Sequence, residues 1–359
     1  MSSNYSEQML IANFEIYLGN TPLSNSDKPY VTNITVDDSV DLPSMFSFEI
    51  VGCDSQQDPY RWIDDEKLFK IGNMIDITLG YGSDLNSLIN GEITSIEPEF
   101  IFNGLPKLIV RGFDLRHRLQ RGKKTRTFVN QKDSDIVDQL ATEAKLSFKI
   151  EDTIVTHAYA IQANQTDLEF IKSRAQLINF ELAMEGKTLL FRPVTLTSNK
   201  PLTLTQSKNL LEFYPRLYAN QQSDKVIVRG WDPVKKEAFS VQAPSNDSIP
   251  IKPKLNGNTL GSQLASNAFG SAIEIVNVLS TTEAEAAQIA TAQFDELTLS
   301  FIKGEGICTG CTDLRSGKVI TIEGVGERFS GQYYVTTATH SYDPQSNYRT
   351  HFTVLRDSI

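Results

Sequence analysis

Residues 316–356 constrain the fold more than any other stretch of this chain. They contain three runs of β-branched and aromatic residues that largely alternate with polar ones, and each run is bounded by Gly, Pro, Asn or Ser. Such alternation is typical of half-buried antiparallel strands joined by turns. The stretch therefore predicts a three-stranded β-meander.

A similar meander is predicted in the first quarter of the chain. Gly72 and Gly91 begin runs that parallel the runs beginning at Gly317 and Gly331. We interpret this as one β unit used twice, with a different domain between the copies. The matched segments are 72–82 with 317–326, 91–97 with 331–337, and 107–111 with 350–355.

A second similarity between two sequence segments does not fit a simple tandem duplication. Residues 109–114 are nearly repeated at 227–232, in a register that differs from that of the two meanders. Matching strand patterns can also arise by convergence on the chemistry of sheets. At this level, both duplication and convergence remain open.

The first 119 residues predict a small β-barrel domain. About six strand-like runs occur before residue 115, which is enough to close such a barrel. The polar segment 53–67, which contains a proline, is expected to cross outside the sheet as a loop. The expected strands span 8–19, 30–37, 45–51, 75–79, 89–97 and 108–110.

The middle of the chain changes to a helical period. Residues 133–144 place their apolar side chains on one stripe, and acidic residues at its start complement the helix dipole. Thr166 and Glu169 form the capping box of a second amphipathic helix, and residues 180–191 predict a hairpin. We therefore expect a small α+β domain at 120–200.

The last part of the chain, 201–359, predicts a second β-barrel domain with a loop and helix insertion at about 236–300. Residues 241–272 are rich in Ser, Asn, Pro and Gly and predict an extended or mobile loop. A capped helix is expected from 280 to about 297. The fold class is thus mainly β, with two similar small β-barrel domains separated by a small α+β domain.

Charge and length narrow the class of partner. The 359 residues are enough for about two to three domains. A net charge of −10 argues against a broad phosphate-binding surface, so no nucleic-acid specificity is expected. Residues 111–126 are locally basic and could dock an acidic partner or nucleic acid. We favour a solvated strand end and linker, because the span lacks interleaved aromatic residues.

No targeting or membrane segment is predicted. Residues 1–7 do not form a basic region followed by an apolar core, so no secretory signal is expected. No apolar run is long enough to cross a bilayer, so no membrane anchor is expected either. We expect synthesis and folding in a bacterial cytoplasm.

Three cysteines, Cys53, Cys308 and Cys311, are too few for a disulfide framework. The last two have the C-x-x-C spacing of a redox disulfide or half a zinc site. Zinc would need two more ligands, and His340 and His351 lie in predicted strands without paired spacing. We favour two small buried or half-buried thiols and predict no metal ligand.

No catalytic or cofactor-binding residue is predicted. The four histidines fall in no nucleophile-elbow, zincin or phosphotransfer motif, and the acidic residues are scattered. We do not expect an enzyme, although lack of a motif does not exclude catalysis. Two other classes remain open. One is a carbohydrate- or envelope-binding β module that uses Tyr333, Tyr334 and Tyr348, and the other is a cell-wall hydrolase, for which we find no converging carboxylate pair.

Several short motifs follow one another in a specific order over almost the whole chain. The motifs are Arg111-Gly112-Phe113-Asp114, residues 125–128 followed by 134–136, the helix start at 164–171, and the closing segment 329–335 with His340. The positions that we take as structural are Gly72, Gly91, Arg111, Gly112, Asp114, Asp135, Asp167, Phe170, Gly317, Gly331, Tyr334 and His340. In this order the chain resembles the phage late control gene D family. That family comprises the baseplate hub proteins of contractile tails and related injection particles, and it is similar to the hub portion of type VI secretion spike proteins.

The resemblance implies a homotrimer in which each subunit carries two similar β-barrels. Three copies would present six similar units, so that one face fits a hexameric inner-tube protein and the other fits a trimeric spike. It implies no catalytic residue, and it implies assembly with other baseplate components into a phage tail or phage-like particle. Because the sequence ends at Ile359, just after the closing meander, the spike is expected to be a separate polypeptide.

Overall fold

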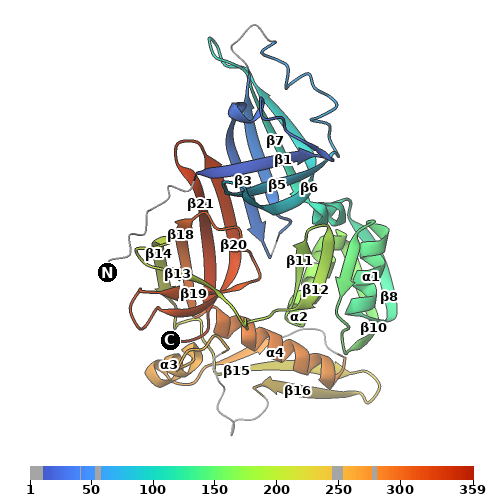
Figure 1. Ribbon diagram of the computed structural model, residues 1–359. Helices are drawn as coiled ribbons and strands as arrows, with labels where there is room; N and C mark the ends of the chain where they lie inside the picture. Colours follow the sequence, from blue (N-terminus) through green and yellow to red (C-terminus); the bar gives the residue numbers. More distant parts are fainter. Residues whose placement is uncertain (1–10, 41, 53–57, 245–253, 277–280) are drawn as a thin grey trace.

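A computed structural model describes residues 11–40, 42–52, 58–244, 254–276 and 281–359. The protein is mainly β, as predicted, and one sheet of 13 strands contains strands from both ends of the chain. Figure 1 shows the amino-terminal strands in blue beside the carboxy-terminal strands in red. The α+β domain, in green, lies to one side of them.

The first β unit consists of antiparallel strands in the order β3-β4-β7-β6-β5-β1. Alternate side chains fill its core, and Phe46, Phe48 and Ile50 are all buried on one face of β4 as their spacing predicts. Met9 and Leu10, which we placed in the first strand, lie outside the described residues. The strands are β1 (Ala12–Leu18), β3 (Val31–Ser39), β4 (Met45–Val51), β5 (Met74–Tyr81), β6 (Asp84–Glu99) and β7 (Lys107–Asp114), with the short elements β2 (Thr21–Pro22), η1 (Lys28–Tyr30) and η2 (Leu115–Gln120).

The second β unit follows the same path, β14-β18-β21-β20-β19-β13. Its outer strand β13 is parallel to β19, whereas β1 is antiparallel to β5 in the first unit. The other pairings have the same direction in both units. The strands are β13 (Leu202–Thr205), β14 (Leu210–Leu217), β18 (Ile302–Thr309), β19 (Val319–Glu323), β20 (Gly331–Asp343) and β21 (Asn347–Arg356).

The likeness extends to single hydrogen bonds. The N–H of Gly72 donates to the carbonyl of Ile93 at 2.8 Å, and the N–H of Gly317 donates to the carbonyl of Val335 at 2.9 Å. Both glycines have a positive φ, 87° and 73°, which favours glycine at each position. A β-bulge follows Ile93 in β6 and Val335 in β20. The two meanders are therefore matched residue by residue.

This match corrects one sequence alignment. In the sheet, Gly91 lies opposite Ile75, and the residue opposite the equivalent Ile320 is Tyr333. Gly331 therefore stands two residues before the true counterpart of Gly91. The sequence comparison aligned Gly91 with Gly331 because both are glycines, whereas the pairing register of the strands is set by the position of the β-bulge.

Large and small side chains exchange places between the two units. Phe46 lies opposite Gly112 in the first unit, and the equivalent pair in the second unit is Gly304 opposite Val354. A Cβ atom on Gly112 would lie 2.0 Å from the carbonyl oxygen of Glu92 and 2.4 Å from the ring of Phe46, so this position requires glycine. The two cores are thus filled by residues of different size at matched positions.

Neither unit closes into a barrel within the described residues, which corrects the predicted barrels to open sheets. β3 does not pair with β1. Instead it pairs with β20, from Ile34 opposite Tyr342 to Ser39 opposite Thr337. This ladder, which we call the intrachain junction, joins the two units into one sheet.

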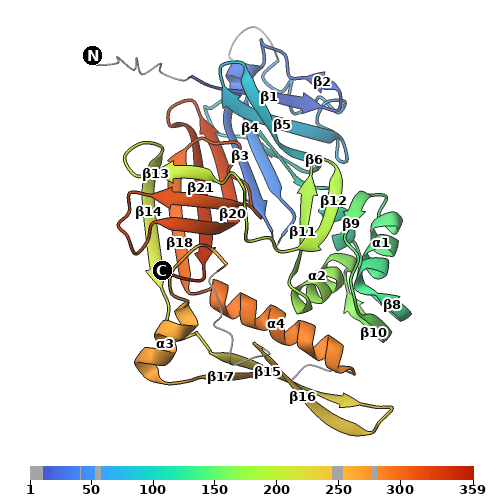
Figure 2. The same cartoon turned by 60° about the horizontal axis from the view of Figure 1, so that its bottom comes forward.

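Residues 227–232, which resemble 109–114 in sequence, are not part of the repeated β unit. They lie in β15 (Lys225–Asp232), which pairs with β16 (Glu237–Ala243) and β17 (Ile273–Val276) in a separate sheet packed on α4 (Glu283–Leu299). Figure 2 shows this sheet below the second unit. The predicted loop 241–272 contains helix α3 (Gly261–Phe269), which begins without a side-chain cap and so gave no start signal. Residues 245–253 and 277–280 lie outside the described residues.

The central α+β domain has the two predicted helices and the predicted hairpin. The capping box of Thr166 and Glu169 is present at the start of α2. One core gathers both helices and the hairpin, and the boundaries at 119 and 200 remain predictions. Its elements are β8 (Lys124–Lys132), α1 (Asp133–Glu143), β9 (Ser147–Ile150), β10 (Thr156–Gln165), α2 (Asp167–Leu177), β11 (Phe180–Glu185) and β12 (Thr188–Pro193).

Candidate functional site

The intrachain junction is fixed by a buried carboxylate on β3. Asp38 accepts hydrogen bonds from Nε of Arg315 at 2.8 Å and from the N–H and hydroxyl of Ser316 at 3.1 and 2.9 Å. Burial alone would raise the pKa of Asp38, but Arg315 and Ser316 hold it below its usual value. Arg315 also donates to the carbonyl of Leu88 on β6 at 2.6 Å. One ion pair therefore ties both units together.

His340 occupies the same junction from β20 and is fully buried. Its Nδ1 lies 2.8 Å from the hydroxyl of Tyr348 and 3.2 Å from that of Thr350. Burial, followed by the nearby charge of Arg315, lowers the pKa of His340 to about 3. The imidazole is therefore neutral near pH 7, and it acts as a packing and hydrogen-bonding group.

The α+β domain docks on the sheet through a buried arginine. Arg116 forms an ion pair with Asp114 at 2.7 Å and donates to the carbonyls of Leu182 and Ser39 at 2.8 and 3.1 Å. The basic span 111–126, predicted as a solvated strand end, is thus partly an internal structural element. Arg116 is buried because its guanidinium joins β7, β11 and β3.

Both β units contact the α+β domain from equivalent positions. Tyr334 of β20 donates to the carboxylate of Glu181 at 2.6 Å. Its counterpart in β6 is Glu92, which contacts that domain indirectly through η2: Glu92 pairs with Arg118 and lies 2.7 Å from Nε2 of His117, and Arg118 donates to the carbonyl of Lys145 at 3.2 Å. The matched positions Tyr334 and Glu92, one in each β unit, therefore both take part in holding the α+β domain on the sheet.

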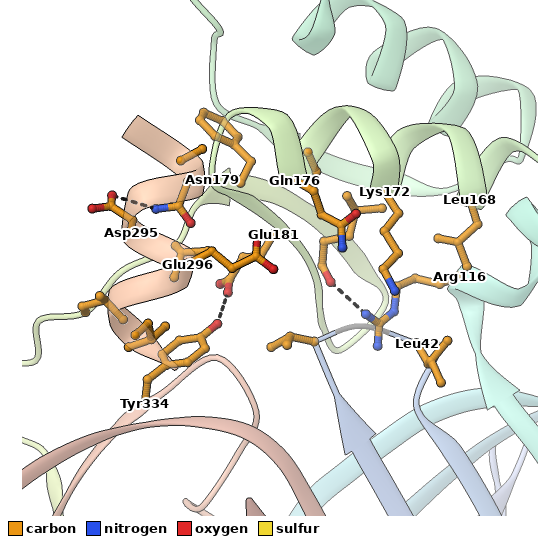
Figure 3. Close-up of a pocket in the computed structure, with 18 residues that line it drawn as sticks. Leu42, Arg116, Leu168, Lys172, Gln176, Asn179, Glu181, Asp295, Glu296 and Tyr334 are labelled. Atoms are coloured by element: carbon orange, nitrogen blue, oxygen red, sulfur yellow. Dashed lines mark hydrogen bonds between the residues drawn. The ribbon is translucent and has the colours of Figure 1, made fainter. Parts of the chain in front are cut away.

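Figure 3 shows the pocket between these contacts, with Tyr334 and Arg116 toward opposite ends. Helices α2 and α4 also line it, and Asn179 donates to Asp295 at 3.3 Å across them. The labelled polar groups mostly bond to one another or to the backbone. The pocket therefore lies at an interface between domains, and its polar side chains serve mainly to hold that interface together.

A second polar cluster ties α4 to the α+β domain. His157 lies 3.0 Å from Asp133, 3.3 Å from Glu285 and 2.7 Å from Arg174. Burial would lower the pKa of His157, but the two carboxylates raise it to about 9. The imidazolium therefore bridges two acidic side chains at neutral pH.

The residues singled out in the sequence do not converge on one site. Asp135 accepts from the N–H of Lys132 at 3.0 Å at the start of α1. Phe170 stacks on Phe128 with ring centres 5.5 Å apart. The remaining contacts are Asp167 with Lys124 at 2.6 Å and Arg126 at 2.7 Å, Arg111 with Glu97 at 3.1 Å, and Gly331 against the guanidinium of Arg356.

Cys308 is buried and Cys311 half-buried, both as free thiols, while Cys53 lies outside the described residues. Burial raises the pKa of Cys308 to about 12, so its thiol stays protonated. Within the described ranges, no three His, Cys, Asp or Glu side chains are grouped to hold a metal ion. In the same part of the chain, no helix has the length and apolar character to span a membrane.

One sheet edge and one hairpin tip carry exposed apolar side chains that the sequence analysis did not predict. On β14, Tyr214 is 57% and Leu217 38% exposed. At the tip that joins β6 to β7, Phe100 is 67% and Phe102 93% exposed. Apolar residues in a turn are the one sequence signal that could have marked this tip.

The fold is that of phage tail proteins. The chain aligns with the 43 kDa tail protein of prophage MuSo2 from Shewanella oneidensis, with a TM-score of 0.68, 13% identity, and 96% and 98% of the two chains covered. A tail protein from Neisseria meningitidis MC58 gives a TM-score of 0.68 at 12% identity, with 96% of each chain covered. An E. coli protein described as a component of the type VI secretion system gives a TM-score of 0.59 at 14% identity, over 91% of this chain and 74% of that one.

A family model described as the Alg8 N-terminal domain matches residues 8–343. The chain therefore belongs to the Alg8 N-terminal domain family, whose description states no activity. No curated protein sequence matches the chain.

Proposed function

We propose that this protein is the baseplate hub of a contractile injection particle, as its resemblance to the late control gene D family implies. It acts as a homotrimer that adapts a hexameric inner tube to a separate trimeric spike. The chain is made in a bacterial cytoplasm and assembled, with other baseplate components, into a phage tail or phage-like particle. Its role is structural, and it is not an enzyme.

The observation that carries the proposal is the repeated β unit. Two units share one strand order, and the β-bulges in β6 and β20 occupy matched positions. A ring closes when its neighbouring faces are nearly equivalent, and three copies of a doubled unit supply six such faces. The tail-protein fold of the solved structures supports the same role.

The three tyrosines that suggested a saccharide-binding module are buried. Tyr333, Tyr334 and Tyr348 are 0%, 4% and 3% exposed, so they cannot stack on a sugar at the surface. Their rings pack within the sheet and against the α+β domain.

Size-exclusion chromatography with light scattering tests the proposal. The chain has a mass of 40.1 kDa, so a trimer has a mass of about 120 kDa, three times that value. We expect this species alone or after addition of the particle's tube protein, and a ring of six similar lobes by electron microscopy. A monomer at all concentrations, with and without the tube protein, would contradict the hub proposal.

A further inference from the structure

The small sheet of β15, β16 and β17 has one face covered by α4 and one face open. Val226 and Val228 of β15 are fully buried in the core that this sheet shares with α4. Because successive residues of a strand point to opposite faces, Ile227, Arg229 and Trp231 lie on the other side of the same strand. In Figures 1 and 2, α4 lies between this sheet and the two larger β units, so the open face points away from them.

This open face, which we call the outer face, is rich in exposed apolar side chains. Trp231 is 53%, Ile273 54% and Ile275 43% exposed. Ile275 lies directly opposite Ile227 in the parallel ladder of β15 and β17. Exposed apolar residues gathered on one face mark a contact surface for another molecule. The outer face consists of Lys225, Ile227, Arg229 and Trp231 of β15, Ala238, Ser240 and Gln242 of β16, and Ile273 and Ile275 of β17.

The charge of the outer face is opposite in sign to that of the whole chain. The three strands place Lys225 and Arg229 on it and no acidic residue, although the chain has a net charge of −10. Arg229 is exposed, and the residue opposite it on β16 is the uncharged Ser240. An exposed cation set among apolar residues favours a partner that brings a carboxylate.

Strand β7 shows how the same sequence pattern is completed elsewhere in this chain. Residues 109–114 resemble 227–232, and Arg111 takes the place of Arg229. Arg111 forms an ion pair with Glu97 of the neighbouring strand at 3.1 Å, and Ile109 is buried. In β15 the neighbouring strand β16 offers no carboxylate at this position, and the apolar residues stay exposed. The comparison indicates what a partner must supply, which is apolar cover and an acid at Arg229.

We infer that the outer face binds an acidic amphipathic helix of a partner protein. The sheet is three strands wide, about 10 Å between its outer strands, and a helix with its side chains is about 10–12 Å across. From Ile227 to Trp231 the strand rises about 13 Å, so apolar residues about two helical turns apart reach both ends. A Glu or Asp between them lies at Arg229. With α4 on the opposite face, the bound helix completes a helix–sheet–helix arrangement.

Other occupants match the outer face less well. Single-stranded nucleic acid stacks its bases on several aromatic rings, and the outer face has one, Trp231. A second copy that brought the same face would set basic side chains against basic side chains. The inference does not depend on the hub proposal, because this sheet lies outside the repeated β units.

A designed peptide tests this chemistry. The probe is a fluorescein-labelled helical peptide of about 18 residues, with Leu along one face and Glu on both flanks. The control peptide has Lys in place of every Glu. By fluorescence anisotropy with the full chain, we expect the acidic peptide to bind at least about tenfold more tightly than the basic one. Equal binding of the two peptides, or no binding of the acidic one, would overturn the inference.

Substitutions locate the binding. Trp231→Ser should weaken binding of the acidic peptide at least about tenfold, because a central aromatic anchor dominates such a contact. Arg229→Glu should weaken it about fivefold and strengthen binding of the basic peptide by a similar factor. Phe102→Ser is the matched control, since it removes a 93% exposed side chain at the tip between β6 and β7, and it should change neither. An equal loss in this control would show non-specific apolar binding and contradict the inference.

Acrylamide quenching gives a readout that needs no substitution. The chain has two tryptophans, and Trp62 is 2% exposed, so quenching of the wild-type chain reports mainly on Trp231. The acidic peptide should reduce this quenching. Binding that leaves the quenching unchanged would place the peptide elsewhere and refute the assignment of this face.

Two further outcomes would assign the outer face to another occupant. Dissociation of an oligomer by Trp231→Ser in the absence of peptide would make the face a contact between copies. Tighter binding of a labelled single-stranded oligonucleotide than of the acidic peptide would make it a nucleic-acid surface. Either result overturns this inference, whereas a monomer that binds the acidic peptide at Trp231 supports it and contradicts only the hub proposal.

Discussion

Replacing Arg116 by methionine tests how the α+β domain is held on the sheet. The side chains of Arg116 and Asp114 are 3% and 2% exposed, so the change leaves a buried carboxylate without its counter-ion. Breaking a buried ion pair in this way costs about 3–5 kcal/mol. Asp114 would keep the backbone N–H of Ser44 as a donor at 2.7 Å. We therefore expect a loss in the free energy of unfolding at the lower end of this range, about 3 kcal/mol.

Urea unfolding at pH 7 measures this loss. With a slope of about 1–3 kcal/mol per molar urea, the midpoint should fall by at least about 1 M. Arg118→Met is the matched control, because Arg118 also pairs with a carboxylate, Glu92, but its side chain is 30% exposed. A partly exposed pair contributes about 1 kcal/mol or less. Equal losses in the two variants would refute the argument that burial makes Arg116 the anchor.

Four further substitutions test the histidines and the repeated turn. His340 has a folded pKa of about 3, so the unfolded chain binds more protons between pH 6.5 and 3 and stability falls as the pH drops through that window. His340→Gln should flatten this slope in urea midpoints measured from pH 7 to 4. His157 has a raised pKa of about 9, so its contribution is full below pH 6.5 and is lost as the pH rises through 9, and His157→Gln should remove that alkaline loss. Gly72→Ala and Gly317→Ala should each cost about 1 kcal/mol because both positions have positive φ, and an effect at only one of them would contradict the matched turns.

Local patterns predicted the elements better than their assembly. The alternation in both meanders and the capping box at Thr166 are signals that act within a few residues, and the structure contains the strands and the helix they predict. Helix α3 was missed because Leu260 at its start offers no cap. The counterpart of Gly91 was displaced by two residues, since a bulge changes the register without leaving a clear mark in the sequence.

The partner of an edge strand is harder to predict, because any strand edge offers the same backbone groups. β3 could have closed a barrel with β1, yet it joins β20 and unites the two units in one sheet. Two features stabilise this pairing: β20 extends beyond β19, and Asp38 contacts Arg315 and Ser316. Neither is visible before the two ends of the chain are brought together.

The same reasoning explains why the edge strands of the two β units carry different residues. Within one chain the junction forms when the chain folds, so a regular ladder with a partly buried ion pair leaves no free edge there. No described strand pairs with the outer edge of β14 or with residues 95–99 of β6 on the edge that faces away from β7, and a regular open edge could recruit any free strand. Pro98 lies in β6 and Pro215 in β14, and a proline on a free strand edge discourages pairing with unrelated strands. Duplication thus provides two similar β units, while their edge residues differ: one pair of edges forms the intrachain junction, and the other pair carries a proline on each strand.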